Sequence, residues 1–233
     1  MSYILLFTIS MLAGLLVFQQ TKPLKPIITI LLSFSGSYLL SICFLHLLPE
    51  LFEENGESLG MYLLIGFFLQ LILDYFSGGI EHGHAHVNKK KIGKFPILIF
   101  LSLSVHAFLE AIPMHQIEEN SSMYSYLLGL SIHKVPISFI FATLLMGYQL
   151  KKNIILVGIL LFSIMGPLGV WVGSYFIFPE LLTQKILAIS VGIILHLSTT
   201  ILLETNDQHK VQFNKLTPLF GGIGFALLTL LFH

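Results

Sequence analysis

The chain has 233 residues and no net charge; 55% of the residues are hydrophobic and only 10% are charged. A soluble domain carries about 25% charged residues, so this composition excludes a soluble globular protein and indicates a polytopic membrane protein. All twelve basic residues are lysines, and they gather in a few connecting segments. Nucleic acid is therefore not expected as a partner. The single cysteine, Cys43, has no second cysteine with which to form an intramolecular disulfide.

Eight apolar segments follow one another along the chain, and each is close to the ~20 residues that a helix needs to cross a bilayer. The first has neither a basic residue before its apolar run nor a clear cleavage site, so we expect a mature helix there rather than a signal peptide. The sequence thus predicts an all-α fold with eight transmembrane helices in a single domain, residues 1–233. The predicted segments are residues 2–18, 27–49, 59–77, 95–115, 122–149, 153–175, 181–203 and 216–232.

The lysines predict the orientation of these helices. If the N-terminus lies outside, ten of the twelve lysines fall in cytoplasmic loops, against Lys185 outside and Lys134 within a helix. By the positive-inside rule we expect both termini outside. The outer connections are instead acidic, and a carboxylate-lined mouth concentrates cations, although acidic loops are also simply soluble and free to translocate. The lack of an arginine-rich leader favours the cell membrane over an organelle membrane.

A histidine and a carboxylate four residues apart, His106 and Glu110, lie inside the fourth apolar segment. This spacing places both side chains on one helix face, one turn apart. His133 lies in the fifth segment, which runs the opposite way, and at 1.5 Å per residue both histidines fall roughly 16 Å from their helix ends. We therefore expect His106, Glu110 and His133 to meet near the middle of the membrane, with His46 and Glu50 nearer the outer mouth.

Imidazole and carboxylate together favour zinc and its first-row neighbours over calcium or magnesium, which prefer all-oxygen ligands. Ionisable groups at membrane depth are expensive, so each is a functional candidate. Pro113 and Pro136 each free a backbone carbonyl beside a candidate ligand, and irregular backbone at this depth is tolerated only where it faces protein or a water-filled path. In the alternative, His106 and Glu110 have a structural role and form hydrogen bonds with each other or with a neighbouring helix.

Four short motifs lie in the second, fourth, fifth and sixth segments. They are His-Leu-Leu-Pro-Glu at 46–50, His-x-x-x-Glu at 106–110, His-Lys-x-Pro at 133–136 and Gly-Pro-Leu-Gly at 166–169. Together with eight helices, outside termini and a histidine-rich third loop, they resemble the ZIP family of divalent-metal transporters. The resemblance implies a helix bundle that carries zinc, sometimes iron or manganese, into the cytosol through helices two, four, five and seven by a rocking or elevator-like movement.

Several positions depart from the ZIP pattern, in which members with two adjacent metals carry further polar or acidic residues on helices four, five and six. The corresponding residues here are Ala107, Lys134, Ile137 and Gly166. The resemblance therefore implies one metal position, held by His106, Glu110 and His133. We predict that Lys134 replaces the second metal as a tethered cation paired with Glu110, or loses its proton and adds a nitrogen ligand. In the alternative, Lys134 turns away by one residue's rotation, about 100°.

The third connection, about residues 78–94, is rich in histidine and lysine. His82, His84 and His86 alternate within it, a composition typical of a flexible cytoplasmic metal-binding tract, unless the histidines are incidental to a solvated loop. His196 in the seventh segment is expected to pack as a core histidine at least as readily as to bind metal. Asp74 falls near the inner end of the third segment.

The predicted function is import of a divalent transition metal, with zinc as the substrate and iron, manganese or cadmium ions as alternatives. No enzymatic activity is expected. One alternative is an intramembrane zinc hydrolase that uses the same ligands to activate water, although no obvious serine and aspartate companions lie at matching depth. Another is a non-transporting relative that senses or buffers metal. The expected partners are the metal ion and the lipid bilayer, with a homodimer left open.

Overall fold

The computed structural model describes residues 2–19, 25–83, 87–88, 90, 92–115, 121–175, 179–204 and 213–231. The described residues form helices and no strand, which confirms the all-α prediction. Among them, seven stretches are long and apolar enough to cross a membrane, and an eighth apolar stretch, Leu216–Thr229, is shorter. The long helices are α1 (Ser2–Leu15), α2 (Lys25–Ile42), α3 (Leu48–Ser77), α4 (Ile97–Leu109), α5 (Ser121–Gly147), α6 (Lys152–Tyr175), α7 (Glu180–Glu204) and α8 (Phe213–Leu231).

Short helical turns flank several of these helices. Two are 3-10 turns beside the sites described below, η3 (Ile80–His82) and η5 (Ile112–His115), and a third, η1 (Leu16–Gln19), extends α1. The π-helical turn η2 (Cys43–Leu47) joins α2 to α3 and carries His46. Single π-helical turns of this kind are frequent at functional sites.

The structure differs from the sequence prediction between the second and third spans. The acidic connection expected after residue 49 is helical, because α3 begins at Leu48 and runs through to Ser77. The two stretches that are apolar enough to cross a membrane are Pro26–Phe52 and Leu59–Ser77, and both lie close to the predicted segments. The stretch between them holds three glutamates, which favour helix, beside Asn55, Gly56 and Ser58, which do not, and the chain nevertheless keeps helical backbone where polarity alone predicts a loop.

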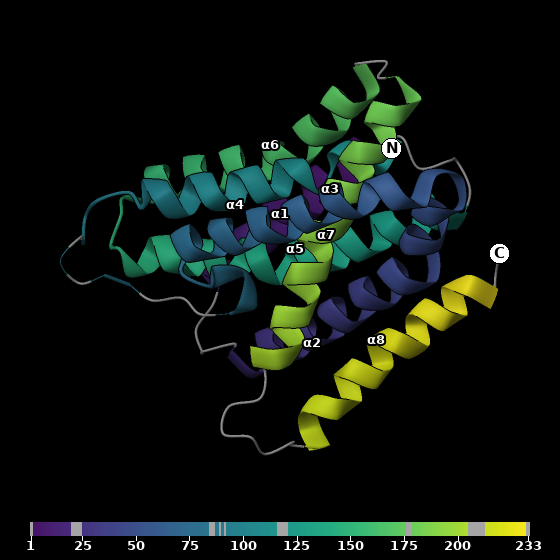
Figure 1. Cartoon of the computed structure of the whole chain (residues 1–233). Coiled ribbons are helices and arrows are strands. Elements are labelled where there is room, and N and C mark those ends of the chain that lie inside the picture. Colours follow the sequence, from purple (N-terminus) through teal and green to yellow (C-terminus); the bar gives the residue numbers. More distant parts are fainter. Residues whose placement is uncertain are drawn as a thin grey trace.

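The helices pack as a bundle in which several pairs run side by side (Figure 1). The pairs with the most extensive contacts are α3 with α7, α2 with α8, α1 with α5 and α6, α2 with α5, and α4 with α6. The beginning of α1 and the end of α8 lie at one end of the bundle, whereas the turn between α5 and α6 lies at the opposite end (Figure 1).

Glycines let the backbones of α3 and α7 touch. A Cβ atom on Gly66 would overlap the carbonyl oxygen of Ile189, and one on Gly192 would overlap the carbonyl oxygen of Leu63. Small residues at helix interfaces permit this close approach in membranes. The contact matters for the site, because α3 and α7 each contribute a polar residue to the same cluster.

The interior holds two apolar clusters, one containing Tyr38, Leu47 and Tyr126 and the other containing Leu103 and Phe141. Large apolar side chains are also exposed along the outside of the bundle, with Met61, Leu64, Phe68 and Tyr75 exposed on α3 alone. A soluble protein rarely exposes so much contiguous apolar surface, whereas the bilayer provides an apolar environment for it. The fold is that of an integral membrane protein.

Candidate metal centres

The first cluster of candidate ligands lies between α4 and α5. His106 is on α4, Glu110 is the residue directly after its last turn, and His133 is on α5. One ligand atom from each of the three lies within 4.8 Å of the others, and all three side chains are at most 1% exposed. We name His106, Glu110 and His133 the midplane centre. The structure therefore brings together the three residues that the sequence predicted to meet.

The end of α4 shapes this centre. Pro113 has no backbone N–H to continue the helix, and α4 stops at Leu109, with the Glu110 N–H bonded to the His106 carbonyl. The freed carbonyl of Leu109 accepts a hydrogen bond from the Ser190 hydroxyl on α7, at 3.0 Å. A side chain from another helix thus satisfies the irregular backbone beside Glu110, as membrane depth requires.

Several polar atoms of the midplane centre have no hydrogen-bond partner among the described residues. They are Nε2 of His106, Oε2 of Glu110 and both ring nitrogens of His133. The first two lie 3.2 Å apart without hydrogen-bond geometry. Leaving a buried polar atom unpaired costs about 1–3 kcal/mol, so a convergent group of such atoms indicates a ligand site.

Lys134 contacts the same carboxylate from the other side. Its Nζ atom pairs with Oε1 of Glu110, and the side chain is only 4% exposed. Lys134 also faces α6, with its Nζ atom 5.9 Å from the centroid of the Phe162 ring and its Cε atom 3.7 Å from the position that a Cβ on Gly166 would occupy. Lys134 therefore pairs with Glu110, as predicted for a charged lysine at this position.

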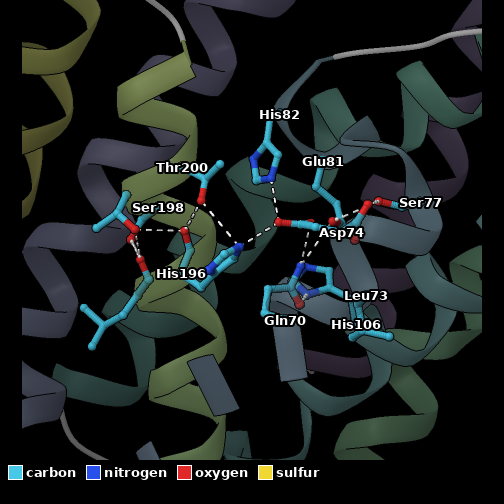
Figure 2. A network of polar contacts seen from close by, with 12 residues as sticks. Gln70, Leu73, Asp74, Ser77, Glu81, His82, His106, His196, Ser198 and Thr200 are labelled. Atoms are coloured by element: carbon cyan, nitrogen blue, oxygen red, sulfur yellow. Dashed lines mark hydrogen bonds and ion pairs between the residues drawn. The ribbon is translucent and has the colours of Figure 1, made fainter. Parts of the chain in front are cut away.

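A second cluster lies where α3 ends. The carboxylate atom Oδ2 of Asp74 is 2.8 Å from Nε2 of His82 on η3 and 2.8 Å from Nε2 of His196 on α7 (Figure 2). These three atoms form the second group that could hold a metal ion among the described residues. We name Asp74, His82 and His196 the inner cluster.

Two glycines produce the inner cluster. Gly78 and Gly79 have positive φ angles of 70° and 74°, a conformation that ends α3, and both N–H groups donate to the Asp74 carbonyl. The chain therefore folds back at once and carries His82 over Asp74. His82, the first of the three alternating histidines, is thereby buried and only 7% exposed. His84 and His86 lie outside the described residues.

Gln70 and Glu81 extend the inner cluster (Figure 2). Nε2 of Gln70 is 3.2 Å from Oδ1 of Asp74 and 3.1 Å from Oε2 of Glu81, and the Ser77 hydroxyl also donates to Glu81. Burial raises the pKa of the Glu81 carboxyl well above its usual range, and the neighbouring Asp74 carboxylate acts in the same direction. A buried Glu81 is thus favoured in its protonated form.

The two clusters differ in access. A pocket of about 840 Å³ opens beside the inner cluster and is lined by Asp74, His82, His196 and Thr200 together with apolar residues of α3. None of the midplane ligands lines it. The inner cluster can therefore exchange an ion with the surroundings, while the midplane centre is enclosed by protein.

His46 and Glu50 belong to neither cluster. His46 is buried on η2, and Glu50 is partly buried in the first turn of α3. Sequence reasoning missed Gln70 and did not assign Asp74 to a site. A signal for both was present, because the two polar residues stand four positions apart within an apolar span and so share a helix face.

Fold and site together define a class of protein, a polytopic helical membrane protein with two buried histidine–carboxylate clusters. No family model matches the chain. The chain is similar to the zinc transporter ZIP1 of Danio rerio, with 22% identity over 202 residues and coverage of 67% of this chain and 67% of the relative.

Proposed function

We propose that this protein is a member of the ZIP family that carries a divalent transition-metal ion, most favourably zinc, into the cytosol. The proposal is supported by the midplane centre, where two imidazoles and a carboxylate converge. Nε2 of His106, Oε2 of Glu110 and both ring nitrogens of His133 have no hydrogen-bond partner among the described residues. Mixed nitrogen and oxygen donors suit zinc better than calcium or magnesium. Iron, manganese and cadmium ions are alternative substrates.

In this proposal the ion passes from the midplane centre to the inner cluster. His46 and Glu50 are proposed to line the approach from outside, and Asp74, His82 and His196 to receive the ion before release into the adjoining pocket. Ten of the twelve lysines lie on the side of the pocket if both termini are outside, which supports release toward the cytosol. We propose a single domain in the cell membrane.

Zinc uptake into proteoliposomes tests this function. Uptake by the parent protein should be saturable, and His106→Ala and Glu110→Ala should each reduce it to the level of empty vesicles, because each removes one of three ligands. His209→Ala, a histidine in the connection between α7 and α8, serves as the matched control and should leave uptake unchanged. Equal uptake by the parent and both site variants, at equal protein content, would contradict the proposal.

The same assay addresses the two alternatives. A zinc hydrolase or a metal-sensing relative would bind zinc in the purified protein yet show no saturable uptake in vesicles. We propose no catalytic role, which the similarity to a protein named as a zinc transporter supports.

A further inference from the structure

Gln70 on α3 contacts one candidate ligand in each of the two clusters (Figure 2). Its Oε1 atom is 3.0 Å from Nδ1 of His106 in the midplane centre. Its Nε2 atom is 3.2 Å from Oδ1 of Asp74 in the inner cluster and 3.1 Å from Oε2 of Glu81. The side chain is fully buried. A single amide therefore spans the space between the clusters.

The chemistry of the partners determines which way the amide faces. An ionised carboxylate only accepts hydrogen bonds, so the Gln70 NH₂ group must face Asp74 and its carbonyl oxygen must face His106. A carbonyl oxygen also only accepts, so Nδ1 of His106 carries the proton and donates. In the neutral imidazole, Nε2 of His106 then keeps its lone pair, and this atom lies 3.2 Å from Oε2 of Glu110.

The same logic applies to Asp74. Gln70 donates to Oδ1, which leaves Oδ2 as the carboxylate atom that faces His82 and His196. In each cluster, Gln70 thus bonds the ligand atom that does not face the other ligands: Nδ1 of His106 in one and Oδ1 of Asp74 in the other. Outer partners of this kind fix the tautomer and orientation of a metal ligand and contribute to its affinity for the ion.

We propose that Gln70 is a shared positioning residue of both metal centres: it fixes His106 as an Nε2 ligand and Asp74 as an Oδ2 ligand at the same time. This inference rests on the proposed function, since it takes both clusters as zinc sites. It goes beyond that function by assigning a residue outside the ligand sets to the preparation of both.

Two substitutions separate the two halves of this role. Gln70→Leu keeps a similar volume but removes the hydrogen bonds to His106, Asp74 and Glu81, so zinc affinity should fall at both centres, by about 10–100-fold for loss of such outer partners. Gln70→Glu keeps an acceptor for His106 but cannot donate to Asp74 when ionised. It should preserve affinity at the midplane centre and weaken the inner cluster, where a further negative charge meets Asp74.

The experiment is zinc titration by calorimetry of purified protein in detergent. A His82→Ala/His196→Ala background reports on the midplane centre, and a His133→Ala background reports on the inner cluster. Gln184→Leu, the same change on α7 at a residue of neither cluster, is the matched control and should match the parent. Nitrogen-15 NMR of histidine-labelled protein provides a second readout, since His106 should be Nδ1-protonated in the parent and in Gln70→Glu but lose this preference in Gln70→Leu.

The expected result is weaker zinc binding at both centres for Gln70→Leu and weaker zinc binding at the inner cluster alone for Gln70→Glu. Parent-like affinity of Gln70→Leu at both centres would overturn the inference, and so would equal weakening of both centres by the two variants, which is what a purely structural role produces. If Gln70→Leu does not fold, the Gln70→Glu pattern decides. A parent protein that binds no zinc at either centre would overturn the proposed function as well.

Discussion

Lys134 on α5 and Glu110, the residue directly after α4, form an enclosed ion pair at the midplane centre, and the other oxygen of the same carboxylate faces Nε2 of His106. One carboxylate thus contacts both Lys134 and a candidate ligand histidine. An ammonium in that position repels a second divalent ion and competes with the first. The relationship therefore bears on how many ions the centre can hold.

The first prediction is that the midplane centre binds one zinc ion in the parent protein. Lys134→Glu removes the tethered cation and adds a carboxylate, so it should admit a second ion or bind the first at least tenfold more tightly, about 1.4 kcal/mol. Zinc should be counted in the His82→Ala/His196→Ala background so that the inner cluster does not contribute. Lys185→Glu provides the charge-matched control, and two midplane ions in the parent would refute the prediction.

The second prediction distinguishes His82 from the histidines that follow it. His82→Ala removes a buried ligand of the inner cluster and should slow zinc uptake and weaken zinc binding in the His133→Ala background. The double change His84→Ala/His86→Ala should spare the transport step, because a tract outside the bilayer can hold metal transiently but cannot form the barrier. Equal loss of uptake in both variants would instead place the whole tract in the ion pathway.

The third prediction concerns the pH dependence of stability at Glu81. Because burial raises its pKa in the folded protein, folded Glu81 binds a proton more tightly than unfolded Glu81 does. The stability that the folded protein gains from this tighter proton binding is fully present below the ordinary pKa of 4.5 and is lost as the pH rises through the raised pKa. Glu81→Gln should therefore gain thermal stability relative to the parent as the pH rises, measured as unfolding midpoints in detergent across a pH series. A constant difference between the two proteins at every pH would show that Glu81 does not titrate in this way.

The fourth prediction uses the backbone contact between α3 and α7. Gly66→Ala places a methyl group against the Ile189 carbonyl and should destabilise the protein by about 1–3 kcal/mol, as overpacking does. It should also weaken zinc binding at the inner cluster, since α3 and α7 carry Asp74 and His196. Gly60→Ala on the same helix is the matched control, because a Cβ there meets nothing within 4 Å. Thermal unfolding of both variants tests this, and equal midpoints would contradict it.

Much of the fold follows from local sequence. Seven of the described stretches have enough consecutive apolar residues to cross a bilayer, and this property does not depend on neighbouring helices. The connection after the second span was missed because polarity indicated a loop, whereas the backbone there retains helical geometry up to Ser77. The pairing of His106 with Glu110 was also local, since a spacing of four residues fixes a shared helix face.

The tertiary structure alone determined which residues from distant segments meet. Asp74 and His196 are separated by 122 positions, and no periodicity in either helix indicates that α3 and α7 are neighbours. Their contact depends on glycines on both helices that let the two backbones approach, and His82 joins them because Gly78 and Gly79 turn the chain back at the end of α3.

The sequence by itself determined a membrane-spanning helical chain with ionisable groups at depth, because the length of an apolar segment and the periodicity of a helix are local properties. The packing of helices decided that those groups form two clusters joined through Gln70, because hydrogen bonds between helices depend on distances that local periodicity does not set.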